Sequence, residues 1–217
     1  LLLYKWLGID APQFAHMPLL RNADKSKISK RKNPAARLTW FVEEGYLPEA
    51  LVNFLALLAY PPAQDAEGND VEKFGFADFA RDFAWSKVNP VGPIFDLKKL
   101  DWLNGEYLRA MTPDELADRI VEHLTFTGEW SDVEPAKVDL LRRATPLIQE
   151  RLGLLSEALG KLDFLFTGDD ELVIADDARA QLGDDSAAVL DAAIDALEVT
   201  EPFDSTSIQA ALRTSLI

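Results

Sequence analysis

A short basic segment near the start of the chain carries residue types suited to chemistry on phosphates. Residues 26–32 read S-K-I-S-K-R-K and are followed at once by Asn33-Pro34. Closely spaced cations ahead of a helix start form a compact site for an anion with several charges, such as a triphosphate. Backbone N–H groups and the Ser29 hydroxyl would add further donors. The segment therefore predicts a triphosphate-binding loop, with a solvated basic loop as the alternative.

Four sequence blocks, in order, resemble one enzyme family. Residues 27–31, K-I-S-K-R, resemble the KMSKS loop of class I aminoacyl-tRNA synthetases in its glutamyl form. The other blocks are F-A-H-M-P-L at 14–19, G-Y-L-P-E-A-L-V-N-F-L at 45–55 and F-D-L-K-K-L-D-W-L-N at 95–104. Together they resemble bacterial-type glutamyl-tRNA synthetase.

The resemblance implies a reaction and roles for the loop. The parent enzyme would attach glutamate to tRNA through a glutamyl-adenylate, using ATP and Mg²⁺. Lys30 and Lys27 would be the catalytic residues of the Lys27–Arg31 motif, which includes Ile28. Lys30, Ser29 and Arg31 would bind ATP. No general base is needed, because the attacking carboxylate is already ionised, so positioning and electrostatic stabilisation suffice.

The resemblance also implies a domain order and a mainly α fold with a few short strands. No HIGH-type motif, which this family carries upstream of the KMSKS loop, occurs in the sequence. We therefore expect residues 1–32 to end a catalytic domain, and the chain to be a C-terminal fragment that binds tRNA without catalysing. Residues 33–106 would form a helical stem-contact region. Residues 107–217 would form an all-helical, C-terminally truncated anticodon-binding domain.

Helix signals recur along the first half of the chain. Asn33 as N-cap and Pro34 at the first helical position predict a helix that runs through Val42 and stops near Gly45. A second helix should begin at Pro48 and end before the two prolines at 61–62, and residues 63–72 should form a surface loop. Four aromatic side chains that follow are expected to anchor a core: Phe74, Phe76, Phe79 and Phe83.

Helix signals continue in the second half. Residues 112–115, T-P-D-E, form a capping box that should start a helix. Helical periodicity returns at 136–166, with Pro146 as a break or kink, and near 185–197 and 205–216. His123 lies beside the apolar stripe and is interpreted as an ordinary surface or boundary histidine. The expected core of this half is Leu116, Ile120, Leu124, Leu140, Leu141, Leu147, Leu155, Leu159, Phe164 and Leu190.

Charge divides the chain. Residues 1–106 carry 13 Lys and Arg against 14 Asp and Glu, whereas residues 107–217 carry 9 against 23. An acidic half is unfavourable for binding phosphates, but anticodon bases are read by stacking and edge hydrogen bonds as well. The stretch 149–155 resembles the family's helical anticodon-binding region, which implies Arg151 as the first candidate tRNA contact, followed by Arg142 and Arg143. The alternative for Arg151 is an ion pair with a neighbouring carboxylate.

Composition excludes several other classes of site. The chain has no cysteine and two histidines, so disulfides and thiolate or histidine metal sites are not expected. No apolar run is long enough to span a membrane, and no signal-peptide pattern follows Leu1. We expect a cytoplasmic monomer whose partner is tRNA, with no membrane contact and no tightly bound cofactor. Charging of glutamate tRNA alone, or of glutamine tRNA as well, fits the resemblance.

Two other functions compete with this interpretation. One is a helical protein-interaction module whose acidic face binds a basic partner; such a module has no use for a K-I-S-K-R loop. The other is a different class I synthetase with a helix-bundle anticodon domain, such as a cysteinyl or methionyl type. The F-D-x-x-K-L-x-W-L-N block and the lack of zinc ligands disfavour it.

Overall fold

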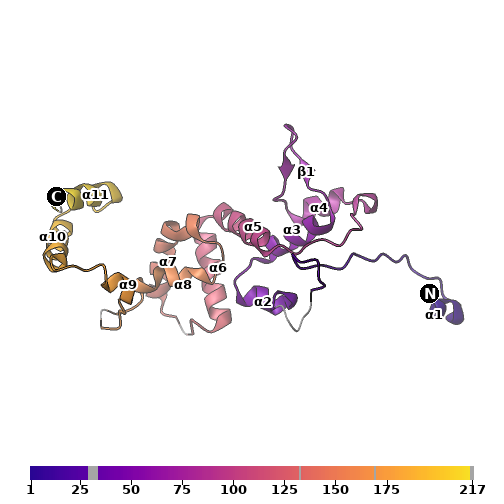
Figure 1. The fold of residues 1–217 in the computed structure, drawn as a ribbon, viewed down its shortest axis with the longest axis horizontal. Helices are drawn as coiled ribbons and strands as arrows, with labels where there is room; N and C mark the ends of the chain where they lie inside the picture. The colour runs from indigo at the N-terminus through magenta and orange to yellow at the C-terminus, as the bar shows by residue number, and fades with distance from the viewer. Residues whose placement is uncertain (29–33, 132, 169, 216–217) are drawn as a thin grey trace. The chain divides into compact units, whose positions relative to one another are not determined.

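The computed structural model describes residues 1–28, 34–131, 133–168 and 170–215, and within them it is mainly α-helical (Figure 1). This confirms the predicted fold class. The chain separates into two compact units, Leu1–Phe166 and Thr167–Ile217. No helix in the described ranges is long and apolar enough to cross a membrane.

The helix expected over residues 34–42 is interrupted. A 3₁₀ turn, η1, covers Pro34–Ala36 and the helix α2 covers Leu38–Glu43, because Arg37 between them has an extended backbone with φ −110° and ψ 129°. The change of direction lets Ala35 and Phe41 enter the same core cluster. Gly45, at φ 82°, follows α2 in the left-handed conformation that favours glycine, as predicted.

The segment expected to be a surface loop contains a small β-hairpin. Strands β1 (Ala63–Gln64) and β2 (Asp70–Val71) pair antiparallel, with Ala63 opposite Val71 (Figure 1). The Asp65 carboxylate fixes the turn by accepting the backbone N–H groups of Glu67 and Asn69 at 3.0 and 2.8 Å. This local hydrogen bonding, and not apolar alternation, makes the hairpin, so the periodicity did not reveal it.

Further helical elements are found among the described residues of the first half of the chain. Their bounds are α1 Leu2–Leu7, α3 Pro48–Ala59, α4 Phe76–Asp82 and η2 Trp85–Lys87. The start of α3 at Pro48 is as predicted.

The four phenylalanines near α4 do not all act as core anchors. Phe74 and Phe79 stack at 5.7 Å between ring centroids, and Phe79 and Phe83 both contact the Tyr60 ring. These three phenylalanines are half-buried, whereas Phe76 is 66% exposed, so the prediction for Phe76 is wrong. Phe76 begins α4, where its side chain lies outside the ring cluster.

The second half of the first unit is a series of packed helices. They are α5 Leu97–Ala110, α6 Pro113–Thr127, α7 Pro135–Ile148, η3 Gln149–Arg151, α8 Glu157–Leu162 and η4 Asp163–Leu165. The predicted capping box is confirmed: the Thr112 side chain accepts from the Glu115 N–H, and the Glu115 side chain accepts from the Thr112 N–H. Pro146 lies inside α7, and the helix continues past it to Ile148.

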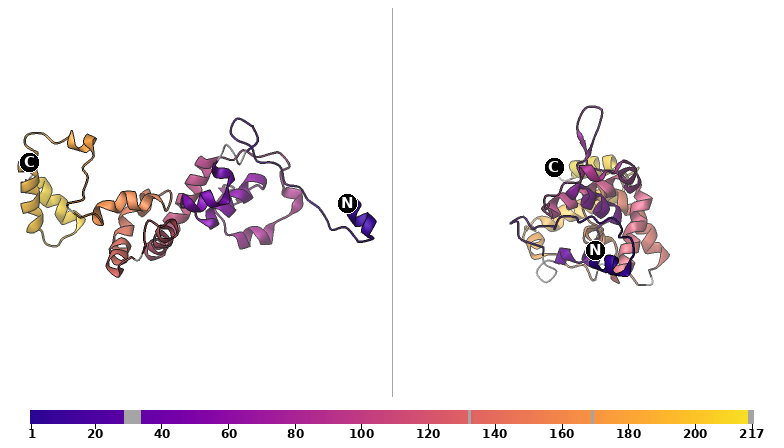
Figure 2. Two further views of the ribbon diagram at one scale, coloured as in Figure 1. Left: turned by 90° about the horizontal axis from the view of Figure 1, so that it is seen from below. Right: turned by 90° about the vertical axis from the view of Figure 1, so that its right-hand side faces the viewer.

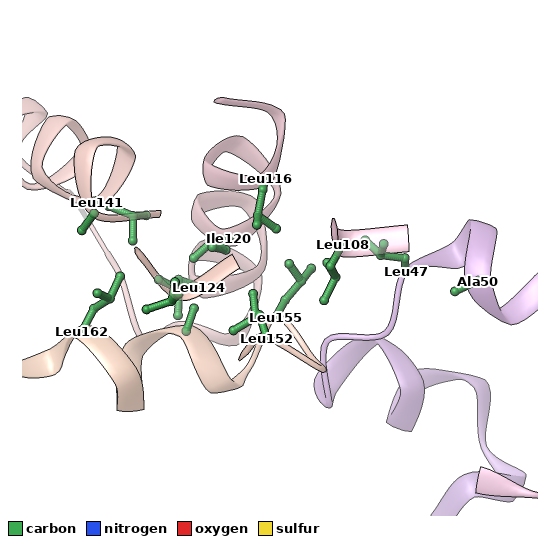
Figure 3. Close-up of a cluster of buried hydrophobic side chains, with 13 residues drawn as sticks. Leu47, Ala50, Leu108, Leu116, Ile120, Leu124, Leu141, Leu152, Leu155 and Leu162 are labelled. Carbon is green, nitrogen blue, oxygen red and sulfur yellow. The ribbon is translucent and has the colours of Figure 1, made fainter. Parts of the chain in front are cut away.

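Two buried clusters hold the first unit together. One cluster is formed by residues of the four helices α5, α6, α7 and α8, and it also includes Leu47, just before α3, and Ala50 in α3 (Figure 3). The other joins η1, α2, α3 and α5.

The expected core of the second half is partly correct. Its buried members are Leu116, Ile120, Leu124, Leu141 and Leu155, and its half-buried members are Leu140 and Leu159. Leu147, Phe164 and Leu190 are 70%, 63% and 53% exposed, so those predictions are wrong. In α7 the buried stripe runs through residues 141, 144, 145 and 148, which leaves Leu147 on the outer face.

His123 is buried, which corrects its interpretation as a surface or boundary residue. Its exposed fraction is 5%, and its Nε2 has no hydrogen-bond partner among the described residues. Position 123 is seven residues after Leu116 and therefore lies on the buried stripe of α6 itself. Burial lowers the pKa of His123, although the nearby Glu129 carboxylate acts in the opposite direction.

Stability should fall as the pH drops through the range in which histidine ionises. Because the folded-state pKa of His123 lies below the ordinary value of a histidine, the unfolded chain binds the proton more readily. The contribution of neutral His123 to the free energy of unfolding is fully present above about pH 6.5 and declines below it. Urea unfolding at about pH 7.5 and pH 5.5 should show a larger drop for the wild type than for His123→Leu. The exposed His16 offers a matched control: His16→Leu should keep the wild-type drop.

The described residues of the second unit include the helices α9 Asp176–Arg179, α10 Ser186–Glu198 and α11 Ser205–Ser215. Helices α10 and α11 pack side by side (Figures 1 and 2). Both agree with the predicted helices near 185–197 and 205–216.

Candidate functional site

The segment that leads into the basic loop is a tight, hydrogen-bonded turn. The Asn22 N–H donates to the Ser26 carbonyl at 2.9 Å, and the Asn22 side chain donates to the Ser26 hydroxyl at 2.9 Å. The Asp24 carboxylate accepts the Ser26 N–H, and the hydrogen bonds from Ser26 lower the pKa of Asp24. After this turn the chain returns alongside Arg21, and the backbones of Arg21 and Lys27 form an isolated antiparallel β-bridge. The turn therefore fixes where the basic loop begins.

The loop itself is described only at its start. Ser29, Lys30 and Arg31 lie outside the described residues, so their predicted roles in catalysis and ATP binding stay predictions. Lys27 is exposed, and no ion pair joins it to any other described residue.

Phe95, the first residue of the 95–104 block, contacts both the segment before the basic loop and the 45–55 block. The Phe95 N–H donates to the Arg21 carbonyl at 2.8 Å, and the Arg21 N–H donates to the Pro93 carbonyl at 3.0 Å. The Phe95 ring lies 6.1 Å from that of Phe41 and 5.0 Å from that of Phe54. The segment before the loop is thus bound to the start of the 95–104 block, and Phe95 of that block packs on the helices α2 and α3.

The three candidate arginines of the acidic half differ in whether a carboxylate of the chain already binds their guanidinium group. Arg142 binds the Asp118 carboxylate at 2.7 Å and the Asp114 carboxylate at 3.4 Å, which joins α7 to α6. Arg143 and Arg151 are exposed, and neither forms an ion pair within the part of the chain that the structure describes.

Arg143 and Arg151 lie on one face of the α7–η3 segment. They are eight residues apart, with the exposed Leu147 midway between them. The Arg151 Nη2 donates to the Leu147 carbonyl at 3.1 Å. The face therefore offers two cations and an apolar side chain, groups suited to phosphates and to base surfaces.

A buried polar contact joins the turn that carries Arg151 to the α2–α3 connection. We name it the junction and define it as residues 44–47, Asn104 and residues 149–156. Asn104 is fully buried; its Oδ1 accepts the Leu47 N–H at 2.8 Å and its Nδ2 donates to the Gly153 carbonyl at 2.7 Å. Sequence reasoning assigned Asn104 no role. The available signal was an amide within the apolar stripe of α5, beside Leu100, Leu103 and Leu108.

The described residues contain no group of three or more His, Asp or Glu placed to hold a metal ion.

Comparison with known families places both halves of the chain. Residues 1–102 match the catalytic-domain model of class I tRNA synthetases of the E and Q type, and residues 115–216 match an anticodon-binding-domain model. These matches define the chain as part of a class I aminoacyl-tRNA synthetase.

Individual relatives narrow the class of synthetase further. A glutamate–tRNA ligase of Acidothermus cellulolyticus is 53% identical over all of this chain and 42% of its own length. One from Cutibacterium acnes is 51% identical over all of the chain and 44% of its own length. A solved glutamate tRNA ligase of Elizabethkingia meningosepticum shares the fold, with a TM-score of 0.72 at 23% identity over 99% of this chain and 44% of that one.

The chain belongs to the glutamyl-tRNA synthetase family. It spans about two fifths of the length of the relatives just described.

Proposed function

We propose that this chain is the tRNA-contacting part of a glutamate–tRNA ligase. The observation that carries the proposal is the 53% identity to a named glutamate–tRNA ligase across the whole chain. The parent would form glutamyl-adenylate from glutamate and ATP with Mg²⁺ and transfer the glutamate to tRNA. The chain alone would bind tRNA and make no adenylate.

Within this proposal the basic loop acts on the triphosphate. Lys30 would neutralise charge that develops as pyrophosphate leaves, and Ser29 and Arg31 would add donors. Lys27 would add to the positive field at the loop. The hydrogen-bonded turn at 22–26 supports this role, because it fixes the point from which a basic loop extends.

The acidic half would contact the anticodon through the face that bears Arg143 and Arg151. Arg151 remains the first candidate because its guanidinium is exposed and its one described hydrogen bond goes to a backbone carbonyl. Arg142 becomes the weakest of the three, since two carboxylates already hold it against α6. The proposed boundaries stay 1–32, 33–106 and 107–217.

Arg151→Ala should weaken binding of tRNA by about 1–3 kcal/mol if the guanidinium contacts an anticodon base. The loss should be largest for tRNA with the cognate anticodon and small for anticodon-swapped tRNA, because only the cognate base offers the right edge. Filter binding of both tRNAs to the 217-residue chain measures this.

Arg142→Ala supplies the matched control for that experiment. It removes the same positive charge from the same unit, but from a side chain already paired with Asp114 and Asp118. Its effect should be slight and equal for both tRNAs. If Arg151→Ala and Arg142→Ala lose the same tRNA affinity, Arg151 contributes only positive charge to binding and reads no anticodon base.

A further inference from the structure

We infer that Asn104 is a positioning residue that, with Gln149, holds the Arg151 turn in a fixed orientation on α5. The part of the inference that concerns anticodon reading rests on the proposed function. The mechanical part rests only on the contacts of the junction.

The Arg151 guanidinium is exposed and bonds only to the Leu147 carbonyl among the described residues, whereas the backbone is anchored on both sides of Arg151. Two residues before it, the Gln149 Nε2 donates to the carbonyls of Leu108 and Met111 at 3.1 and 2.8 Å. Two residues after it, the Gly153 carbonyl accepts from Asn104. Both anchors come from α5 or the residue that ends it, so this helix is the platform on which the turn is mounted.

The anchors are buried, so water does not substitute for them. Asn104 is 0% and Gln149 8% exposed. Loss of the Asn104 amide would leave the Leu47 N–H and the Gly153 carbonyl without their described partner, and an unsatisfied buried polar group is costly. Hydrogen bonds also depend on direction, which apolar packing does not. The amide therefore determines the orientation of the turn as well as its attachment.

The other side of the junction adds two more bonds to the same turn. The Leu155 N–H donates to the Gly45 carbonyl at 3.1 Å, and the Ser156 hydroxyl donates to the Glu44 carbonyl at 2.7 Å. Apolar side chains close around them: Leu47, Leu108, Leu152 and Leu155 lie together at this point (Figure 3). A binding group gains selectivity when the residues that support it are held in this way.

Asn53 provides a matched control in the same unit. It is 2% exposed, its Oδ1 accepts from the Phe74 N–H and the Tyr107 hydroxyl, and its Nδ2 donates to the Glu72 carbonyl. It thus resembles Asn104 in burial and in bonding, but it holds residues 72–74 and not the Arg151 turn.

The first test compares Asn104→Ala with Asn53→Ala in tRNA binding by the whole chain. Asn104→Ala should reduce the preference for cognate over anticodon-swapped tRNA by about fivefold or more, on the scale of one lost buried hydrogen bond. Asn53→Ala should keep the preference at a similar loss of thermal stability. Ser156→Ala, which removes one half-buried bond of the junction, should act in the same direction as Asn104→Ala but more weakly. Equal preferences in the two asparagine variants would overturn the inference.

The second test needs no tRNA. Because the chain has no cysteine, nitroxide labels can be attached at two exposed positions, Glu43→Cys next to residues 44–47 and Glu150→Cys in the Arg151 turn. Dipolar electron paramagnetic resonance should give a broader distance distribution in Asn104→Ala than in the labelled parent, and an unchanged one in Asn53→Ala. An unbroadened distribution in Asn104→Ala would overturn the positioning role. Arg151→Ala that keeps the full anticodon preference would instead overturn the proposed reader.

Discussion

Lys30→Ala in the full-length synthetase should lower adenylate formation by orders of magnitude. Removing one charge-assisted contact to a developing negative charge costs about 2–4 kcal/mol in the transition state. Stability should change little, since a loop lysine has little packing to lose. ATP–pyrophosphate exchange and a thermal melt measure the two effects.

A lysine far from the loop controls for the loss of charge. Lys137 is exposed on α7 in the acidic half, and Lys137→Ala should leave the exchange rate at its wild-type value. A near-wild-type exchange rate for Lys30→Ala would remove the loop from the mechanism and leave it as a solvated basic segment.

Gly45→Ala should destabilise the chain by about 3 kcal/mol, from backbone strain and overpacking together. Gly45 has φ 82°, and an added Cβ would lie 2.6 Å from the Ser156 nitrogen and 2.9 Å from the Leu155 nitrogen. Both are backbone atoms, so no flexible side chain can move aside. Urea unfolding, followed by circular dichroism, would measure the change.

Gly128 separates the clash from the backbone strain. It also has a positive φ, 80°, but an added Cβ there would meet nothing within 4 Å. Gly128→Ala should therefore cost only the strain, about 1 kcal/mol. If the two variants are equally destabilised, the close approach of residues 155–156 to Gly45 contributes nothing to stability.

Local chemistry explains which elements were predictable from the sequence. Pro48 at a helix start, the Thr112–Glu115 capping box and the glycine after α2 each act within a few residues, and each is where it was expected. The resemblance to the family likewise depended on short contiguous stretches of sequence. The hairpin at Asp65 also depends on local chemistry. It is formed by hydrogen bonds to the Asp65 side chain, which a pattern of alternating apolar residues does not indicate.

Burial was harder to predict, because it depends on distant neighbours. His123 and Leu147 are both on amphipathic helices, yet the histidine is buried and the leucine exposed. The neighbours of each helix decide which stripe is covered, and those neighbours come from other parts of the chain. The same reason hid Asn104: its partners, Leu47 and Gly153, are 57 and 49 residues away.

The sequence indicates the residue types of the candidate site but not how they are grouped in space. It singles out three arginines as the clustered cations of the acidic half, and their contact with tRNA stays a prediction. Their separation into one arginine tied to α6 and two exposed ones depends on Asp114 and Asp118, which approach Arg142 only after α6 and α7 pack.

The long reach of the junction has a consequence for the order of events during synthesis. Glu44 and Ser156, which it joins, are 112 residues apart along the chain. On the ribosome, residues 44–47 are therefore synthesised long before residues 149–156, which pack against them. Contacts of such wide separation close late and slow the search for the native state. Until residue 156 emerges, Leu47 has only part of its apolar surroundings, so its native packing forms after most of this chain has been made.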